Sequence, residues 1–367
     1  SIPHPDVFKA MEEASKAFIR IPELQAWAGK RIAEAFEAEA GLPTAGAVNG
    51  LTLAAAACMM KNTDLEKHDP LKPQSWQEII QKLPLHTGGL KTKFIVQANN
   101  RNTYDHAVEC AGGELIEAGT KEKVEKKELI DAYIEGETAA YYLTVKPSSD
   151  ILPLKDVAEI AYDLGVPVIV DAAPFLTHKH VPDKLLKEGA DILAFSGGKQ
   201  LGGPNNSGIL LGRSDLIKLA HLQAYPFDGI GRGAKMSRET IVGLIRALEI
   251  FMARDDEAYY SRMEEETRRF SSKLDKIKGI NSGIVYENTV LDNVTKPSYA
   301  YIEIDGEKNV TLVGLHRILL DATPPIETLL EPFFLIKNAE NKITIKMEYL
   351  IEGDKEIILD KIKSIFL

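Results

Sequence analysis

Two apolar runs, each followed by a polar residue, constrain the fold of this chain more than any other feature. The first run, Val166-Pro-Val-Ile-Val170, is rich in β-branched residues and ends at Asp171. The second, Ile192-Leu-Ala-Phe195, leads into Ser196-Gly-Gly-Lys199. Continuous apolar runs of this kind are typical of strands buried on both faces of a parallel sheet. Because open α/β sheets bind ligands at the carboxyl ends of their strands, we expect Asp171 and Lys199 at a ligand site.

The pairing of this aspartate with this lysine predicts pyridoxal phosphate chemistry. A lysine in a partly dry site loses its proton readily and forms a Schiff base with an aldehyde. A buried carboxylate can keep a pyridine nitrogen protonated, so that the ring accepts electrons. The two glycines before Lys199 permit a tight turn and close approach of a cofactor, and Ser196 could donate its hydroxyl to a phosphate. Either Asp171 or Lys199 alone is more typical of a solvated loop residue, and the interpretation depends on their order after two buried strands.

A second candidate for phosphate binding lies earlier in the chain, at the start of an expected helix. The small residues Thr44-Ala-Gly-Ala-Val-Asn-Gly50 lead into Leu51-Thr-Leu-Ala-Ala-Ala-Ala-Cys-Met-Met60, a strong helix former. Such a start offers free backbone N–H groups and the positive end of the helix dipole. Small residues at a helix start are equally compatible with close packing alone.

Several motifs together resemble one known family. They are Val168-Ile-Val-Asp-Ala-Ala173, Phe195-Ser-Gly-Gly-Lys199 and Gly202-Gly-Pro-Asn-Asn-Ser-Gly208. With them the chain resembles fold type I pyridoxal-phosphate enzymes of the selenocysteine synthase-like family, which includes L-seryl-tRNA selenium transferase and D-glucosaminate-6-phosphate ammonia-lyase. The resemblance extends from Ser1 to Ile343–Asp354, and only a short segment that family members usually carry at the N-terminus has no counterpart.

The resemblance implies an α/β protein of the fold type I PLP-dependent transferase fold. We expect a large domain with a mostly parallel seven-stranded sheet and a smaller C-terminal α/β domain. Residues 1–40 are expected to form N-terminal helices that pack with the small domain, residues 41–235 the large cofactor-binding domain, and residues 236–367 the small domain. Gly41-Leu-Pro43 is interpreted as a turn, and Arg238 to Lys278 as one long helix crossing to the small domain.

The resemblance also implies roles for single residues. Lys199 would form the Schiff base and exchange the Cα proton of the substrate, and Asp171 would hold the protonated pyridine. The other residues expected to bind pyridoxal 5'-phosphate are Ala45, Gly46, Ala47 and Ser196 at the phosphate, Arg232 from this or a neighbouring subunit, Ala173 against the ring, and Asn100. Asn100 stands where relatives commonly place the histidine that stacks on the ring.

Further polar residues are candidates to line the pocket or to protonate a leaving group. They are Arg101, Tyr104, His106, His178 and Lys179. The spacing of His178 and His180 could also be interpreted as a metal pair, but a loop facing solvent or substrate is favoured, and we expect no metal site.

Composition narrows the partners of this chain of 367 residues. Its formal charge of −10 gives no general attraction to nucleic acid or to an anionic membrane. The most apolar run, Leu51 to Met60, is too short to span a bilayer. Two cysteines are too few for a disulfide framework and indicate a reducing, cytoplasmic location.

The reaction expected from the resemblance is α,β-elimination from a hydroxylated amino acid or amino-sugar acid, releasing ammonia and a 2-keto acid. Three alternatives stay open: a seryl-tRNA selenium transferase, an aminotransferase, and a non-catalytic homologue. A small-molecule substrate and a homodimer or higher homo-oligomer are implied, because sites of this fold type are generally built across a dimer.

Overall fold

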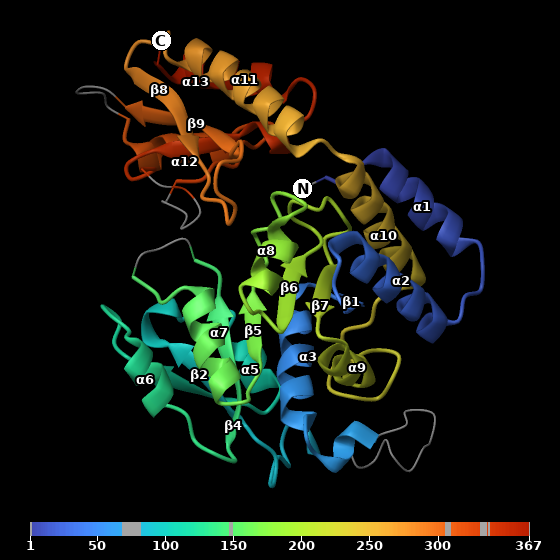
Figure 1. Cartoon of the computed structure of the whole chain (residues 1–367). Helices are drawn as coiled ribbons and strands as arrows, with labels where there is room; N and C mark the ends of the chain where they lie inside the picture. The colour runs from blue at the N-terminus through green and yellow to red at the C-terminus, as the bar shows by residue number, and fades with distance from the viewer. Residues whose placement is uncertain are drawn as a thin grey trace. The chain divides into compact units, whose positions relative to one another are not determined.

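The computed structural model describes residues 2–67, 82–146, 150–304, 310–330, 336 and 338–366. The chain divides into two compact units, Ser1–Ala253 and Arg254–Leu367, which Figure 1 shows from blue to red along the chain. Within the described residues, no helix combines the length and the apolar character that crossing a membrane requires.

The first unit is built on a seven-stranded, mostly parallel sheet, and this confirms the expected architecture. The strand order is β1-β7-β6-β5-β4-β2-β3, and only β7 runs against its neighbours. The strands are β1 (Ala40–Thr44), β2 (Lys93–Gln97), β3 (Glu114–Ala118), β4 (Thr138–Thr144), β5 (Val168–Asp171), β6 (Ile192–Ser196) and β7 (Gly208–Gly212).

Helices cover both faces of this sheet. On one face α3 is buried along nearly its whole length and packs with α5 and α9 against alternate residues of the strands, such as Tyr142 and Ile169. On the other face the neighbouring Tyr141 donates its hydroxyl to the carbonyl of Leu129 in α6 at 2.8 Å. The helices of the unit are α1 (Pro5–Ser15), α2 (Ile21–Phe36), α3 (Ala47–Met60), α5 (His106–Cys110), α6 (Lys126–Asp131), α7 (Leu154–Asp163), α8 (Val181–Lys187), α9 (Ser214–Gln223) and α10 (Arg238–Ala253), with the 3₁₀ turns η1 (Asp64–Lys67) and η2 (Ala98–Asn100).

The segment around Pro43 is a strand, and its interpretation as a turn was wrong. β1 pairs antiparallel with β7, with Thr44 opposite Gly208. A proline has no backbone N–H and would interrupt the hydrogen bonding of a central strand, which pairs on both sides. β1 is the last strand of the sheet and pairs on one side only. An edge strand therefore tolerates Pro43, and it leads directly into α3.

The helix expected from Arg238 to Lys278 is two helices, α10 and α11 (Asp256–Leu274). Asp255 caps the second one, because its side chain accepts a hydrogen bond from the N–H of Ala258 at 3.1 Å. The two compact units divide at this break, so the division differs from the boundary expected at residue 236.

The N-terminal helices belong to the first unit, and they pack on α10, which lies within residues 236–367, the range expected to form the small domain. Helix α1 packs on α10, and α2 packs on both α10 and β1. An ion pair between Arg246 and Asp6 at 3.3 Å and a hydrogen bond from Arg238 to the carbonyl of Ser15 at 3.0 Å support this packing. The amphipathic pattern identified these helices, but it carried no information about which surface they cover.

The second unit is a small α/β lobe with a three-stranded antiparallel sheet in the order β10-β9-β8. Its core is formed by apolar residues of the strands and helices, including Phe270, Ile302 and Leu315. The elements are α11, β8 (Ile280–Tyr286), β9 (Ser298–Ile304), α12 (Leu312–Leu320), β10 (Ile343–Lys346), η3 (Met347–Tyr349) and α13 (Asp354–Phe366).

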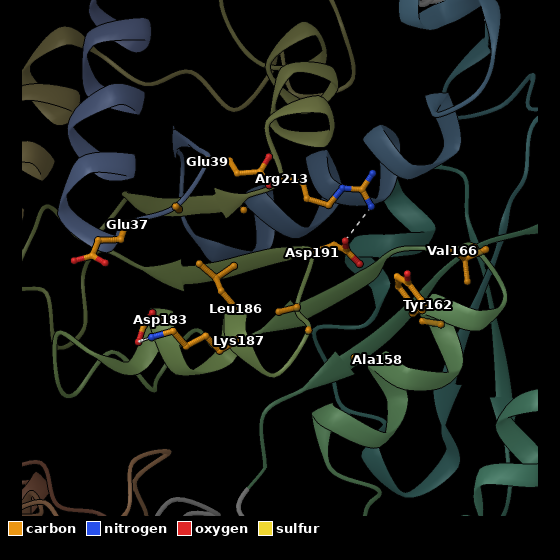
Figure 2. Close-up of a pocket in the computed structure, with 16 residues that line it drawn as sticks. Glu37, Glu39, Ala158, Tyr162, Val166, Asp183, Leu186, Lys187, Asp191 and Arg213 are labelled. Atoms are coloured by element: carbon orange, nitrogen blue, oxygen red, sulfur yellow. Dashed lines mark hydrogen bonds and ion pairs between the residues drawn. The ribbon is translucent and has the colours of Figure 1, made fainter.

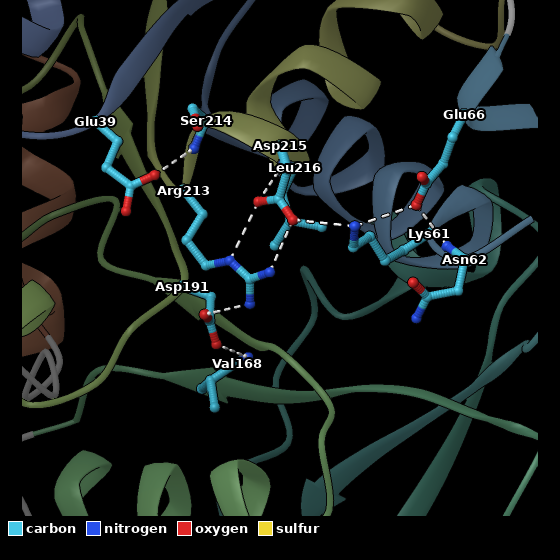
Figure 3. A network of polar contacts seen from close by, with 10 residues as sticks. All are labelled: Glu39, Lys61, Asn62, Glu66, Val168, Asp191, Arg213, Ser214, Asp215 and Leu216. Carbon is cyan, nitrogen blue, oxygen red and sulfur yellow. Dashed lines mark hydrogen bonds and ion pairs between the residues drawn. The ribbon is translucent and has the colours of Figure 1, made fainter.

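An ion network ties the amino-terminal ends of β5 and β6 to β7 and α9 (Figure 3). Arg213 donates to Asp191 at 2.9 Å and to Asp215 at 2.8 Å. Asp191 in turn accepts from the N–H of Val168 at 2.8 Å, and Asp215 also pairs with Lys61 at 3.2 Å. The network therefore fixes the position of the strands that carry Asp171 and Lys199 at their far ends.

Replacing Arg213 by methionine is expected to lower the free energy of unfolding by about 1–2 kcal/mol, because two carboxylates lose a shared partner that is part-exposed. Chemical denaturation measures the change. Lys187→Met, which breaks the exposed pair with Asp183, is the control expected to change stability much less. Burial opposes the ionisation of Asp215, but hydrogen bonds from Arg213 and Lys61 lower its pKa overall.

The sign of the pH dependence follows from that lowered pKa. The stabilisation is full above the carboxyl pKa of the unfolded chain and is lost as the pH falls through the lower pKa of the folded protein. The difference in stability between the wild type and Arg213→Met should therefore shrink in acid. A difference that is constant with pH would show that Arg213 acts by packing alone.

Candidate active site

The carboxyl ends of β4, β5 and β6 bring polar residues together at one edge of the sheet. Thr144 at the end of β4 lies opposite Asp171 at the end of β5, and Asp171 lies opposite Ala194 in β6. The Asp171 side chain is buried and accepts one hydrogen bond from the N–H of Ala173 at 2.9 Å. Burial raises the pKa of Asp171, and the hydrogen bond from Ala173 and the charge of Lys199 oppose this only in part. A positively charged partner would therefore lower the free-energy cost of burying the Asp171 carboxylate.

Lys199 is held beside Asp171 by a glycine turn after β6. A side chain at Gly197 would lie 2.3 Å from the hydroxyl of Ser207, and one at Gly198 would lie 2.8 Å from the Cα of Asn205, so both positions need glycine. Lys199 as a residue is exposed, but desolvation at its amine lowers its pKa, and the charge of Asp171 counteracts the effect. The charges of Asp171 and Lys199 thus act on each other.

The start of α3 lies beside the start of β7 and the end of β6. A side chain at Gly208 would lie 2.6 Å from the carbonyl carbon of Gly46 and 2.8 Å from the nitrogen of Ala47, and Gly208 pairs with Ser196 in the sheet. Gly46 precedes the helix with a φ of 92°, which favours glycine, and no side chain caps the helix. The N–H of Ala45 is used by the side chain of Asn49 at 3.3 Å. The first amides of α3 are thus gathered near Ser196 as a candidate anion site.

Asn100 holds the end of β4 through both polar atoms of its side chain. Its amide donates to the carbonyl of Thr144 at 2.9 Å, and its oxygen accepts from the N–H of the same residue at 2.8 Å. Asn100 is buried, so these bonds fix η2 against the strand beside Asp171. Contact between Asn100 and a cofactor ring stays a prediction, and the structure gives this side chain a bracing function that the sequence did not indicate.

The remaining candidates differ in how they are held. His178 is buried with its Nδ1 3.0 Å from the hydroxyl of Thr177, and Lys179 donates to the carbonyl of Met252 at 3.1 Å. Tyr104 is exposed, and the Nδ1 of His106 lies 2.6 Å from the carbonyl of Thr103.

Arg232 is engaged within its own loop. Its guanidinium pairs with Asp228 at 3.2 Å and lies 5.0 Å from the centre of the Tyr225 ring. The loop packs on α3, where a side chain at Gly231 would lie 2.8 Å from Leu53, two turns beyond the start of the helix. A role for Arg232 at the phosphate therefore stays a prediction. The arginine could reach the phosphate of its own chain or that of a neighbouring subunit.

A separate depression of about 800 Å³ lies at the opposite edge of the sheet (Figure 2). Its lining includes Val166 and Asp191, which precede β5 and β6, and Arg213 of the ion network. None of the predicted site residues lines it. The candidate active site is thus defined by its side chains at the carboxyl edge, as the strand order requires.

Two residues of the site were not singled out from the sequence as candidates for chemistry. Tyr142 of β4 and Asp105 before α5 are both buried and carry polar atoms without a hydrogen-bond partner among the described residues. Tyr142 shares strand parity with Thr144, which lies opposite Asp171. The alternation of side chains along β4 could have identified Tyr142 from the sequence, but only with knowledge of the register between β4 and β5.

Known proteins resemble this chain in sequence and in fold. The family model of L-seryl-tRNA selenium transferase matches residues 105–278. A 5'-C-glycyluridine monooxygenase-decarboxylase of Streptomyces sp is 28% identical over 75% of this chain and 66% of its own length. The D-glucosaminate-6-phosphate ammonia lyase of Salmonella typhimurium is 26% identical over 67% of this chain and 62% of its own length. The chain thus spans slightly less than two thirds of each of these relatives.

A solved structure of D-glucosaminate-6-phosphate ammonia-lyase superimposes with a TM-score of 0.81 at 20% identity, covering 100% of this chain and 91% of that one. At this identity the likeness establishes the fold. Three observations are consistent with a fold type I pyridoxal-phosphate enzyme: the strand order, the Asp171–Lys199 pair at the carboxyl edge and the matched family model. The family model, the curated relatives and the solved structure support a relationship of this chain to the selenocysteine synthase-like family of fold type I pyridoxal-phosphate enzymes.

Proposed function

We propose that this protein is a pyridoxal 5'-phosphate-dependent lyase that acts at Cα and Cβ of a hydroxylated amino acid or amino-sugar acid and releases ammonia and a 2-keto acid. The observation that carries the proposal is the buried Asp171 carboxylate beside Lys199 at the carboxyl edge of the sheet. The similarity to D-glucosaminate-6-phosphate ammonia lyase supports the type of reaction.

The residues at this edge fit the cofactor at three points. Asp171 is desolvated with one backbone hydrogen bond, and a protonated pyridine nitrogen supplies the positive partner that lowers the cost of burying its charge. The uncapped start of α3 and the hydroxyl of Ser196 suit a phosphate, and the missing side chain of Gly208 lets the start of α3 pack closely against β7. Lys199 suits the aldehyde, since desolvation raises the fraction of neutral amine.

The environments of Asp171 and Lys199 indicate what each residue would do in the reaction. When bound, the cofactor supplies an electron sink for negative charge at Cα. Asp171 holds the proton on the pyridine nitrogen. Lys199 would take the Cα proton of the substrate, a task for which its lowered pKa suits it.

Elimination needs an acid that protonates the leaving hydroxyl at Cβ. Among the candidates, Lys179 is bonded to Met252 and His178 lies beside Thr177 in the core. Tyr104 and His106 are the more accessible ones, and both lie in the segment that runs from the end of η2 at Asn100 to the start of α5 at His106. We propose that the donor comes from this segment. Loss of water across Cα and Cβ, followed by hydrolysis of the carbon–nitrogen bond, gives the keto acid and ammonia with no external oxidant.

The proposal predicts that a 3-hydroxy amino acid or an amino-sugar acid yields ammonia and a keto acid in equal amounts without added keto acid. Colorimetric indophenol detection of ammonia and hydrazone formation from the keto acid measure the two products, and neither assay adds a keto acid. Alanine is the control, because it has no group to eliminate at Cβ. Ammonia from alanine, or turnover that depends strictly on an added 2-keto acid, would contradict the lyase assignment, and the latter would indicate aminotransfer.

A second candidate reaction rests on the relative from Streptomyces, whose name describes an oxygenating decarboxylation. Release of CO₂ with consumption of O₂ in the same substrate screen would favour it. Selenium transfer to seryl-tRNA has less support, since the net charge of −10 disfavours an RNA partner. Submicromolar, salt-sensitive binding of bulk tRNA would revive it. A cytoplasmic homo-oligomer without a membrane or nucleic-acid partner remains part of the proposal.

A further inference from the structure

A glutamine side chain links the two loops that carry Asp171 and Lys199. The amide nitrogen Nε2 of Gln200 donates to the carbonyl of Pro174 at 2.5 Å. Gln200 directly follows Lys199 in the turn after β6, and Pro174 lies in the loop that follows Asp171 and β5. The bond therefore joins the two segments at the edge of the sheet where the candidate active site lies.

The backbone hydrogen bonds between these two segments end just before this contact. The N–H of Ser196, the last residue of β6, donates to the carbonyl of Ala173 at 3.2 Å. The N–H of the next residue, Gly197, donates instead to the carbonyl of Ser207 at 2.9 Å, because the chain turns away toward β7. The side chain of Gln200 thus adds a connection beyond the end of the strand pair.

Both central residues of the turn after Lys199 are anchored. The N–H of Gly202 donates to the carbonyl of Lys199 at 3.0 Å, which makes Gln200 and Leu201 the central pair of a β-turn. Leu201 is 4% exposed and belongs to the core, and the side chain of Gln200 is bonded to the loop after β5. A turn held at both central positions keeps the backbone of Lys199 in a fixed place relative to that loop.

The contact requires a hydrogen-bond donor at position 200. A carbonyl oxygen only accepts, so Nε2 of Gln200 must face Pro174 and Oε1 must point away. Oε1 is buried and has no hydrogen-bond partner among the described residues. Pro174 is buried too, so a side chain without a donor would deprive its carbonyl of this bond. The amide makes one bond while its oxygen stays unpaired, and this favours a role in placing the two loops over a gain in stability alone.

We infer that Gln200 is a positioning residue that holds the turn of Lys199 on the loop of Asp171 through its bond to Pro174. The inference rests on the proposed function for its consequence, which is that the Lys199 amine stays placed and dry enough to react. Desolvation lowers the pKa of this amine. A turn that opens would hydrate the amine and raise its pKa, so that a smaller fraction is neutral and able to attack an aldehyde.

The first test follows amide hydrogen exchange in the apoprotein and needs no cofactor. In Gln200→Met, which keeps the volume but has no donor, protection of the N–H groups of Ser196 and Gly202 should fall about 10-fold, as for the loss of one hydrogen bond. Gln97→Met is the matched control, because Nε2 of Gln97 donates to the carbonyl of Leu152 at 3.0 Å beyond the end of β2. It should leave the same two N–H groups as protected as in the wild type.

Gln200→Glu supplies a readout that a merely space-filling side chain would not change. At pH 8 its carboxylate has no hydrogen to donate and repels the carbonyl of Pro174, so protection should fall at least as far as in Gln200→Met. At pH 5 the carboxyl group, whose neutral form burial favours, takes up a proton and donates it to that carbonyl. Protection relative to the wild type at the same pH should then recover in Gln200→Glu and stay low in Gln200→Met.

The second test measures the covalent capture of pyridoxal phosphate by Lys199 across a pH series. Borohydride added at timed intervals fixes the adduct, and peptide mass spectrometry gives its rate of formation. In Gln200→Met the pH at which the rate is half-maximal should move upward, because the amine of an open turn is hydrated and holds its proton more strongly. In Gln97→Met it should stay at the wild-type value.

The outcomes separate this inference from the proposed function. Wild-type protection in Gln200→Met, an equal loss in Gln97→Met, or a loss in Gln200→Glu that is the same at pH 5 and pH 8 would each overturn it. An unchanged pH midpoint of capture in Gln200→Met would overturn it as well, because the turn would then not position Lys199. If the wild type forms no adduct while the exchange results follow expectation, the proposed function fails and the link between the loops stands as a property of the apoprotein.

Discussion

Lys199→Ala is expected to abolish turnover, with a loss of at least about 10⁴-fold, while the fold stays intact. The substitution removes both the amine that bonds the cofactor and the base that takes the Cα proton, and the two functions are not independent. The fold should survive because Lys199 lies in an exposed turn whose shape is determined by Gly197 and Gly198. Steady-state ammonia release and thermal unfolding measure the two properties.

The matched control for this variant is Lys184→Ala. Lys184 pairs with Glu188 at 3.0 Å on α8 and has no proposed part in the reaction. It should retain full turnover. A Lys199→Ala protein that kept more than a few per cent of wild-type turnover would show that another residue takes the Cα proton.

Asp171→Asn should lose turnover by about 10²–10⁴-fold and yet make the apoprotein more stable. An amide cannot hold the charge of a protonated pyridine, and strong electrostatic contributions to catalysis are of this size. The gain in stability follows from burial, which raises the pKa of Asp171 and so penalises its charged form in the folded protein. We expect the melting temperature of the apoprotein to rise by about 2–4 °C, as for a gain of about 1 kcal/mol.

The pH dependence of this gain has a definite sign. Because the pKa of Asp171 is raised on folding, the folded wild type takes up a proton more readily than the unfolded chain and becomes relatively more stable as the pH falls through the raised pKa. The advantage of Asp171→Asn should therefore be largest at neutral pH and shrink in acid. The exposed Asp163 on α7 serves as the control, and Asp163→Asn should change neither turnover nor stability.

The sequence was most informative at the centre of the sheet. Apolar runs bounded by Asp171 and by the glycines before Lys199 predicted β5 and β6, and the side chains at their ends lie at one edge as expected. Both features are local, because burial on two faces requires a run of apolar residues and a tight turn requires glycine. The same local signals predicted α3 from Leu51 onward, although the helix begins four residues earlier, at Ala47.

Features that depend on pairing between distant segments could not be predicted in the same way. β1 contains Gly41 and Pro43, which read as a turn until β7 is known to lie beside them. The helical pattern ran unbroken through Arg254 and Asp255, so the break between the two units was missed. The bracing of β4 by Asn100 joins residues 44 positions apart, and local patterns carry no trace of such a contact.

The most direct test of the central claim is borohydride reduction of the protein loaded with pyridoxal phosphate, followed by peptide mapping. The carboxyl-edge site predicts a cofactor adduct on one lysine, Lys199, with loss of the visible absorption band and no adduct in Lys199→Ala. Mapping of the adduct to another lysine, or a purified protein that takes up no cofactor at all, would contradict the assignment of this edge as the active site.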